Sequence, residues 1–248
     1  MCGIGLKRMP KRYIQTTEDI LYSYEELDAD AKDEAFDTWQ KEQWEDHDQS
    51  QWDAEYICDD AKQIGEHIGI EIKDIWYSGF WSQGDGACFT GEYNYKKGWR
   101  KALSGYLGSR ARIAELEAEG HDMSSSKEVF RIAEELQKLA AKYFYSVLTY
   151  VQHSGHYYHE MCTRIYQSDY EDRPMSDDDL EVMKDLLRDY MRWIYKRLEE
   201  ADEYRSSKEK FLEEIADLDI YFNEDGGEMF EGVMDKELED YVEEDETE

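Results

Sequence analysis

Residues 70–95 read IEIKDIWYSGFWSQGDGACFTGEYNY, and they predict a β-hairpin. Apolar and polar side chains alternate on both sides of the loop Ser82–Gly86, as they do in strands with one buried face. In the second strand, alternate residues from Ala87 to Tyr95 share one face and are mostly aromatic or small. The loop is longer than a tight hairpin turn, so we interpret it as a candidate site.

A second hairpin is predicted over residues 143–167, YFYSVLTYVQHSGHYYHEMCTRIYQ. The dipeptide Ser154-Gly155 has the length and glycine content of a two-residue turn. In that register His153 faces His156 and Thr149 faces Glu160 across the strands. This arrangement would place four side chains on one side of the hairpin: His153, His156, Tyr158 and Glu160.

Helical periodicity surrounds the two hairpins. Pro174 and Ser176, followed by three aspartates in the first turn, predict the start of a long helix that ends near Arg205. The other predicted helices cover Ser23–Glu45, Gln51–His67, a segment ending near Gly120, Lys127–Lys142 and Ser207–Leu218, and a short strand is predicted at residues 11–16. The fold class is therefore α+β, with an antiparallel sheet of two aromatic hairpins packed against several helices. We expect a single domain over residues 1–230 and an acidic tail at residues 231–248.

The two loops suggest a binding site for a small polar, nucleotide-like molecule. Glycines on both sides of Asp85 allow a close approach of the backbone to a ligand. An alternative is that these glycines only shape the loop and that Asp85 bonds to its own backbone. The candidate ligand-binding residues are Trp81, Gln83, Asp85, His153, His156, Tyr158 and Glu160.

The histidines also raise the question of a metal site, because neutral imidazoles bind zinc. On a strand, however, His159 falls on the face opposite Glu160, so His153, His156 and Glu160 would need Asp85 as a further ligand. We expect no metal and no cofactor.

Catalytic signatures are weak. Met1-Cys2-Gly3-Ile4 resembles the start of class II glutamine amidotransferases, in which the cysteine is the nucleophile, but over four residues only. The sequence contains neither a GxSxG nor a HExxH motif. We therefore assign no catalytic residue and expect binding rather than catalysis.

The chain is strongly acidic, with 61 acidic and 29 basic residues and a net charge of −32 over 248 residues. Such a charge disfavours direct binding to nucleic acid. No apolar run approaches the roughly 18 residues of a membrane span. The four cysteines show no CxxC spacing and no cleavable signal peptide precedes them, so we expect a reduced, cytoplasmic setting.

The excess acid is concentrated in two segments. Residues 25–60 carry 15 acidic residues against Lys32 and Lys41, and residues 223–248 carry 13 against Lys236. Carboxylates that recur at every helical turn can imitate the phosphates of duplex DNA, whereas the simpler alternative is a solvated surface. The candidate partner-binding residues are Asp30, Asp33, Glu34, Asp37, Glu42, Glu45 and Asp46.

Three segments carry a resemblance over most of the chain: SGFWSQGDGACF at 78–89, HSGHYYHE at 153–160 and RWIYKRLEEADEY at 192–204. They resemble a family of phage- and prophage-encoded proteins, some of them labelled as the antitoxin of a toxin–antitoxin system. The resemblance implies an accessory protein in the bacterial host cytosol. Together with the charge, it predicts a protein that binds and inhibits a host nuclease, restriction enzyme or other defence component. A ligand-binding or catalytic module and an antitoxin are the alternatives.

Overall fold

The computed structural model describes residues 20–167 and 174–230, without the side chains of residues 47–49. These residues group into two compact units. The larger unit is Asp46–Arg205, and the smaller unit comprises the described parts of Met1–Glu45 and Ser206–Glu248. The single domain predicted over residues 1–230 stays a prediction. The strand at 11–16 and the tail at 231–248 lie outside the described residues.

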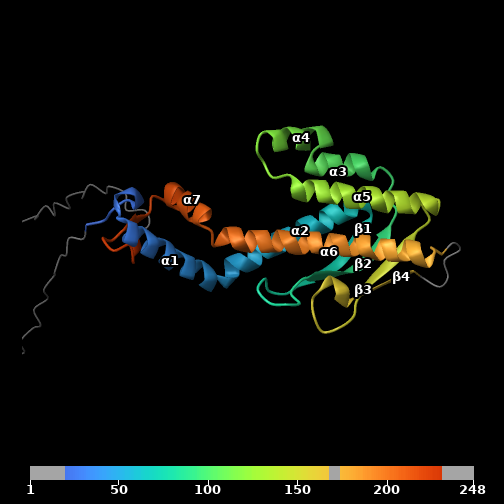
Figure 1. Ribbon diagram of the computed structural model, residues 1–248, viewed down its shortest axis with the longest axis horizontal. Coiled ribbons are helices and arrows are strands. Elements are labelled where there is room, and N and C mark those ends of the chain that lie inside the picture. The colour runs from blue at the N-terminus through green and yellow to red at the C-terminus, as the bar shows by residue number, and fades with distance from the viewer. Residues whose placement is uncertain (1–19, 168–173, 231–248) are drawn as a thin grey trace, which may run out of the picture. The chain divides into compact units, whose positions relative to one another are not determined.

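A four-stranded antiparallel sheet forms the base of the larger unit (Figure 1). Its strands follow the order β1-β2-β3-β4, so the two hairpins lie side by side. The fold class predicted from the sequence, α+β with an antiparallel sheet of two hairpins, is confirmed. The strands are β1 (Ile70–Tyr77), β2 (Ala87–Asn94), β3 (Leu148–His153) and β4 (Thr163–Gln167).

One face of β2 is buried beneath the helices, as its alternation predicts. Phe89 and Tyr93 are completely buried on this face. Gly91 lies between them, and a Cβ atom there would be 2.0 Å from the carbonyl oxygen of Glu71. Strand β1 has an irregularity between Ile72 and Asp74, directly opposite this glycine. Only glycine therefore allows the first hairpin to close.

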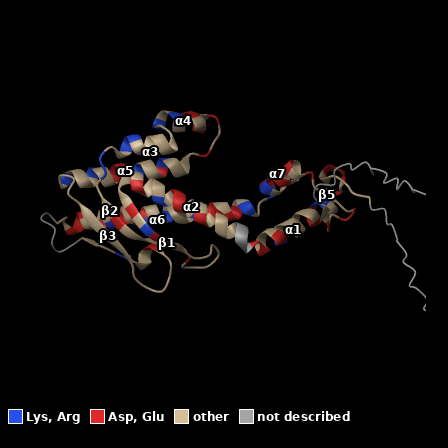
Figure 2. Ribbon diagram, turned by 180° about the vertical axis from the view of Figure 1, so that it is seen from behind, with Lys and Arg blue, Asp and Glu red and all other residues tan. Residues whose placement is uncertain are grey.

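Helices α5 (Ser124–Lys142) and α6 (Asp177–Arg205) lie side by side over this sheet face (Figure 1). The long helix begins where the sequence predicts, because the Ser176 hydroxyl accepts a hydrogen bond from the Asp179 N–H at 3.2 Å. Both acidic and basic residues occur along this helix (Figure 2). The remaining helices of the larger unit are α2 (His47–Ile68), α3 (Trp99–Leu107) and α4 (Arg110–Ala118).

Helix α6 joins the core of the larger unit through its apolar stripe, with Leu187, Tyr190 and Ile194 fully buried. The Tyr190 hydroxyl donates a hydrogen bond to the Ala61 carbonyl at 2.6 Å, which connects α6 to α2. Helix α2 ends at Ile68, one residue beyond the predicted end at His67, and the next residue is Gly69, whose φ of +94° suits glycine.

The smaller unit packs around aromatic rings. Helix α1 (Ala29–Glu45) contributes Trp39 and helix α7 (Lys208–Leu218) contributes Phe211, and the centroids of their rings lie 5.3 Å apart. Phe222 joins them from β5 (Tyr221–Phe222), which pairs with β6 (Met229–Phe230).

The predicted start of the first helix at Ser23 is wrong. Residues 24–26 form only a short 3-10 turn, and α1 starts at Ala29. The Asp28 carboxylate caps α1 by accepting the Ala31 N–H at 2.9 Å. Glu26 caps the turn before it, since its carboxylate accepts hydrogen bonds from the Ser23 N–H and hydroxyl. Two caps in succession therefore break the helical pattern that the sequence suggests.

The predicted turn at Ser154-Gly155 is also wrong. His153 pairs with Thr163 and not with His156, and Thr149 pairs with Gln167 and not with Glu160. This register places Val151 opposite Ile165, and both side chains are buried. The predicted register would have put Val151 opposite the polar Tyr158, so burial of an apolar pair decides the pairing.

Candidate functional site

The first loop, residues 78–86, is shaped by Asp85. Its carboxylate Oδ2 accepts hydrogen bonds from the backbone N–H groups of Trp81 at 3.1 Å and Ser82 at 2.6 Å. The Asp85 N–H in turn donates to the Ser82 carbonyl at 3.1 Å. The carboxylate thus organises its own backbone, which is the alternative that the sequence left open.

Two neighbouring aromatic residues of this loop point in different directions. The Phe80 ring packs between Tyr77, at 6.4 Å, and Tyr195, at 5.6 Å. The Tyr195 hydroxyl also donates to the Gly79 carbonyl at 3.0 Å, which fixes the loop to α6. Trp81 is 84% exposed, and Gln83 beside it is exposed as well. The loop therefore presents an indole to solvent from a fixed backbone.

The second loop, residues 154–162, replaces the predicted tight turn. It ends in a 3-10 turn at Glu160–Cys162, and the Ser154 N–H donates to the Cys162 carbonyl at 2.8 Å. The Tyr158 ring returns over the sheet, 5.7 Å from His153 and 6.4 Å from Trp76. These three rings form an aromatic cluster that joins the two hairpins.

The Glu160 side chain is largely enclosed, with 13% of its surface exposed. Its carboxylate lies 3.3 Å from a guanidinium nitrogen of Arg192 and 3.2 Å from Nδ1 of His159. That Nδ1 also accepts the Met161 N–H at 3.1 Å. Arg192 therefore balances the charge of Glu160.

The two loops touch each other. A Cβ atom on Gly86 would lie 2.9 Å from Cδ2 of His159, so only glycine leaves room for that imidazole. The structure thus brings Asp85, Tyr158 and Glu160 into two neighbouring loops, and His153 lies at the end of β3 where the second loop begins. His156 is exposed and packs edge-on against Tyr157 at 5.4 Å, away from the aromatic cluster.

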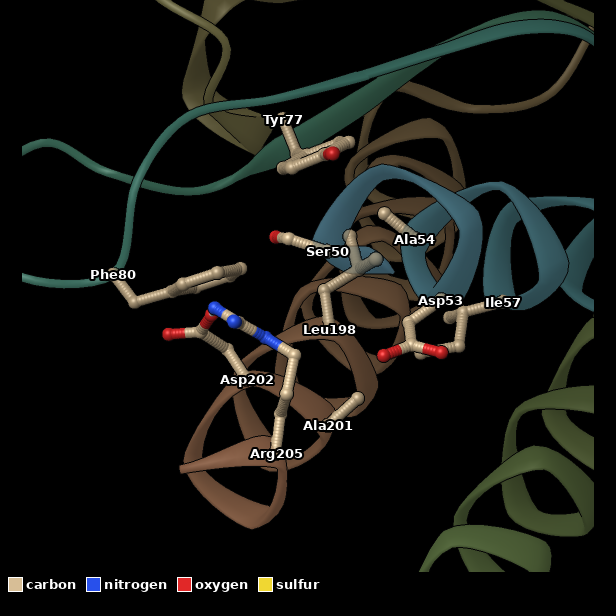
Figure 3. Close-up of a pocket in the computed structure, with 10 residues that line it drawn as sticks. All are labelled: Ser50, Asp53, Ala54, Ile57, Tyr77, Phe80, Leu198, Ala201, Asp202 and Arg205. Atoms are coloured by element: carbon tan, nitrogen blue, oxygen red, sulfur yellow. The ribbon is translucent and has the colours of Figure 1, made fainter. Parts of the chain in front are cut away.

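Behind the first loop lies a small cavity between the ends of β1, α2 and α6 (Figure 3). Tyr77 and Phe80 form its aromatic wall, and Asp202 pairs with Arg205 at 3.0 Å on the opposite side. The cavity measures about 20 Å³, enough for one water molecule. It is too small for a nucleotide-like ligand, since ligand pockets span roughly 300–1,000 Å³.

A larger groove of about 310 Å³ lies between the start of α5 and α6. The Trp193 N–H donates to the Ser125 hydroxyl at 2.8 Å inside it, and the Arg197 guanidinium covers the indole ring at 5.0 Å. Its basic side chains all have carboxylate partners: Arg192 pairs with Asp189 and Glu160, Lys196 with Glu200, and Arg197 with Asp60. This groove is not among the sites predicted from the sequence. The only signal was the cluster of cations within residues 192–204 of a very acidic chain.

The predicted acidic surface occupies α1. Six of its seven residues lie on this helix, Asp46 follows directly, and all seven are exposed. Within the described part of the chain, none of the six helical carboxylates forms an ion pair; these are Asp30, Asp33, Glu34, Asp37, Glu42 and Glu45. Acidic side chains predominate along this helix (Figure 2). The carboxylates of α5 and α6, by contrast, are mostly paired with lysine or arginine.

An open hollow of about 710 Å³ adjoins the start of α1 within the smaller unit. Its lining has no basic side chain and contains five carboxylates, those of Asp28, Asp30, Glu34, Glu224 and Asp225. This hollow extends the acidic surface of α1.

A protein-family model described as "Domain of unknown function (DUF8835)" matches residues 52–208. The chain belongs to this family. The DUF8835 region coincides closely with the larger unit, Asp46–Arg205. Searches of curated proteins and of solved structures find no match.

Both loops, the aromatic cluster and the α5–α6 groove lie inside the DUF8835 region, whereas α1 lies outside it. Within the described residues of the chain, no group of three or more His, Cys, Asp and Glu side chains could hold a metal ion. Burial raises the pKa of the Cys88 thiol to about 11, so at neutral pH this cysteine is protonated and a poor nucleophile. None of the described helices is long and apolar enough to cross a membrane.

Proposed function

We propose that this protein acts by binding, with α1 and its carboxylates occupying a basic surface of a partner protein. The supporting observation is the row of six exposed α1 carboxylates without ion pairs among the described residues. In α5 and α6, by contrast, most carboxylates pair with a basic side chain, as Asp179 does with Lys142. Charges left unmatched on one helix favour a partner that supplies the opposite sign.

The spacing of these carboxylates supports a partner that normally binds nucleic acid. Successive turns of a helix repeat every ~5.4 Å, and Asp30, Glu34 and Asp37 follow that repeat. A protein surface built to neutralise phosphates carries lysine and arginine at comparable density. The resemblance to phage-encoded proteins then implies a host nuclease, restriction enzyme or other defence component as the partner, inhibited in the manner of a DNA mimic.

The loops support this proposal less directly. Asp85 accepts hydrogen bonds from its own loop backbone and Glu160 pairs with Arg192, so both carboxylates already have structural partners. A second candidate function, binding of a nucleotide-like molecule, is favoured by the contact of the two loops beside the Trp76, His153 and Tyr158 rings. Nucleoside monophosphates should then quench tryptophan fluorescence in the wild type but not in a His153→Ala variant. An antitoxin would share the acidic binding surface but would require a toxin encoded beside it.

The main proposal is tested by capturing partners from a bacterial lysate with three forms of the chain at 50 and 500 mM NaCl. The test variant removes three α1 charges: Glu34→Gln, Asp37→Asn and Glu42→Gln. The matched control removes three exposed charges of the larger unit: Glu71→Gln, Asp178→Asn and Glu203→Gln. Each variant changes the net charge from −32 to −29, so total charge cannot explain a difference between them.

The proposal predicts that wild type and control retain the same basic protein at 50 mM NaCl and release it at 500 mM, while the α1 variant retains little of it. Equal retention by the α1 variant would show that binding depends on another surface. If no protein is retained at 50 mM NaCl, the binding function itself is refuted.

A further inference from the structure

Helix α2 presents two large aromatic side chains to solvent. Trp52 and Tyr56 are each 74% exposed, although the opposite side of the same helix is buried through Ile57, Ala61 and Ile64. Residues four positions apart lie next to each other on a helix surface, so the two rings form one patch. Trp and Tyr are the residues most enriched at the energetic centres of protein interfaces.

Tyr106 of α3 extends this patch. Its ring is 42% exposed, and its hydroxyl donates to Oδ1 of Asp60 at 2.5 Å. The other carboxylate oxygen of Asp60 pairs with Arg197, so Asp60 holds the Tyr106 hydroxyl in a fixed position. We name Trp52, Tyr56 and Tyr106 the α2 aromatic surface.

Carboxylates border the α2 aromatic surface. Between residues 51 and 66, α2 carries five acidic residues and one basic residue, Lys62. Lys62 pairs with Asp59 at 3.1 Å. Glu55 lies between the two exposed rings in sequence and is itself exposed. Asp60 pairs with Arg197 and Glu66 with Lys96, so the negative charge beside the rings comes chiefly from Glu55, which forms no ion pair with another described residue.

Aromatic rings and carboxylates select the same kind of partner. Ring faces attract guanidinium and ammonium groups by cation–π interaction, and carboxylates pair with the same groups. An apolar partner would remove water from the carboxylate at the rim without supplying a counter-charge, which is unfavourable. A second copy of the chain would add electrostatic repulsion, since each copy carries a net charge of −32. Arginine is favoured over lysine because its planar guanidinium stacks on rings.

We propose that the α2 aromatic surface docks an arginine-bearing segment of a basic protein, with guanidinium groups stacked on Trp52 and Tyr56. This surface lies in the larger unit and shares no residue with the α1 carboxylates. This proposal rests on the proposed function, since it describes the chemistry of the same kind of partner. The roles of the two surfaces can nevertheless be refuted separately.

The test measures binding of fluorescein-labelled hexa-arginine and hexa-lysine peptides by fluorescence anisotropy. The full chain carries the three α1 neutralisations throughout, which weakens binding by that helix equally in every form compared. In this background, Trp52→Ala/Tyr56→Ala is compared with Trp81→Ala. Trp81 is a matched control because it is a tryptophan that is even more exposed, at 84%.

We expect hexa-arginine to bind more tightly than hexa-lysine, and Trp52→Ala/Tyr56→Ala to weaken hexa-arginine about tenfold, as two exposed cation–π contacts imply. The preference for arginine should disappear in that variant and persist in Trp81→Ala. Unchanged affinity and unchanged preference in the double variant would overturn the proposal. The proposal would also be overturned if sedimentation showed a dimer for the parent chain and a monomer for the double variant, since the surface would then bind a second copy.

Discussion

Asp85 gives the sharpest prediction for the first loop. Its carboxylate accepts two backbone N–H groups, those of Trp81 at 3.1 Å and Ser82 at 2.6 Å. Replacing Asp85 by Ala removes both hydrogen bonds while leaving the buried strands on either side unchanged. The loop should therefore open locally without unfolding of the domain.

The size of the effect follows from the number of bonds. A hydrogen bond to a charged acceptor contributes about 1.5–3 kcal/mol when shielded, and solvent at this exposed loop reduces that figure. We expect about 1–2 kcal/mol in total for the opening of the loop. Every ~1.4 kcal/mol corresponds to a factor of ten, so amide protection at Trp81 and Ser82 should fall about tenfold. Asp85→Asn keeps one neutral acceptor, so amide protection at Trp81 and Ser82 should fall by less in this variant.

Hydrogen–deuterium exchange of the Trp81 and Ser82 amides measures this effect directly. Gln83→Ala is the matched control, because Gln83 is an exposed residue of the same loop. Its exchange should equal that of the wild type. Unchanged protection in Asp85→Ala would refute the reasoning, because the carboxylate would then be free to serve a ligand.

Two further predictions concern single side chains of the larger unit. The hydrogen bond to Asp60 raises the pKa of Tyr106 to about 12, so the folded state holds this proton more tightly than the unfolded chain does. The resulting stabilisation is complete below pH ~10 and is lost as the pH rises through about 12. Asp60→Asn should lower this pKa towards 10 in an ultraviolet titration corrected with Tyr106→Phe, and an unmoved titration would contradict the assignment. Gly91→Ala would force a Cβ to 2.0 Å from the Glu71 carbonyl oxygen, whereas Gly105→Ala in α3 meets nothing within 4 Å. Thermal melts should show that Gly91→Ala lowers the free energy of unfolding by about 1–3 kcal/mol, as overpacking does, and that Gly105→Ala raises it by up to about 1 kcal/mol. Equal melting temperatures of the two variants would be inconsistent with this packing.

The first hairpin and α6 could be predicted because local signals agree with the tertiary packing. In β2 the buried face follows the alternation of side chains, and the Ser176 cap with its first-turn aspartates marks the start of α6. The same agreement ends α2 directly before Gly69. Where periodicity, caps and burial all favour one answer, the sequence alone is sufficient.

The turn and register of the second hairpin could not be predicted, because a local turn signal competed with a distant apolar pair. Ser154-Gly155 suits a tight turn, but only the longer loop buries Val151 against Ile165. The predicted face of His153, His156, Tyr158 and Glu160 depended on that turn, so it is lost as a strand face. Loop contacts such as Gly86 against His159 have no sequence signal, since they arise when the two hairpins pack together.

The proposed partner-binding role of α1 is the central claim, and displacement of duplex DNA tests it most directly. The protein captured by the wild-type chain is bound to labelled duplex DNA, and each form of the chain is then titrated at 100 mM NaCl. We expect wild type and the Glu71, Asp178 and Glu203 control to displace the DNA, while neutralisation of Glu34, Asp37 and Glu42 weakens displacement at least tenfold. Displacement by the α1 variant at wild-type concentrations, or a ternary complex in which chain and DNA bind together, would contradict it.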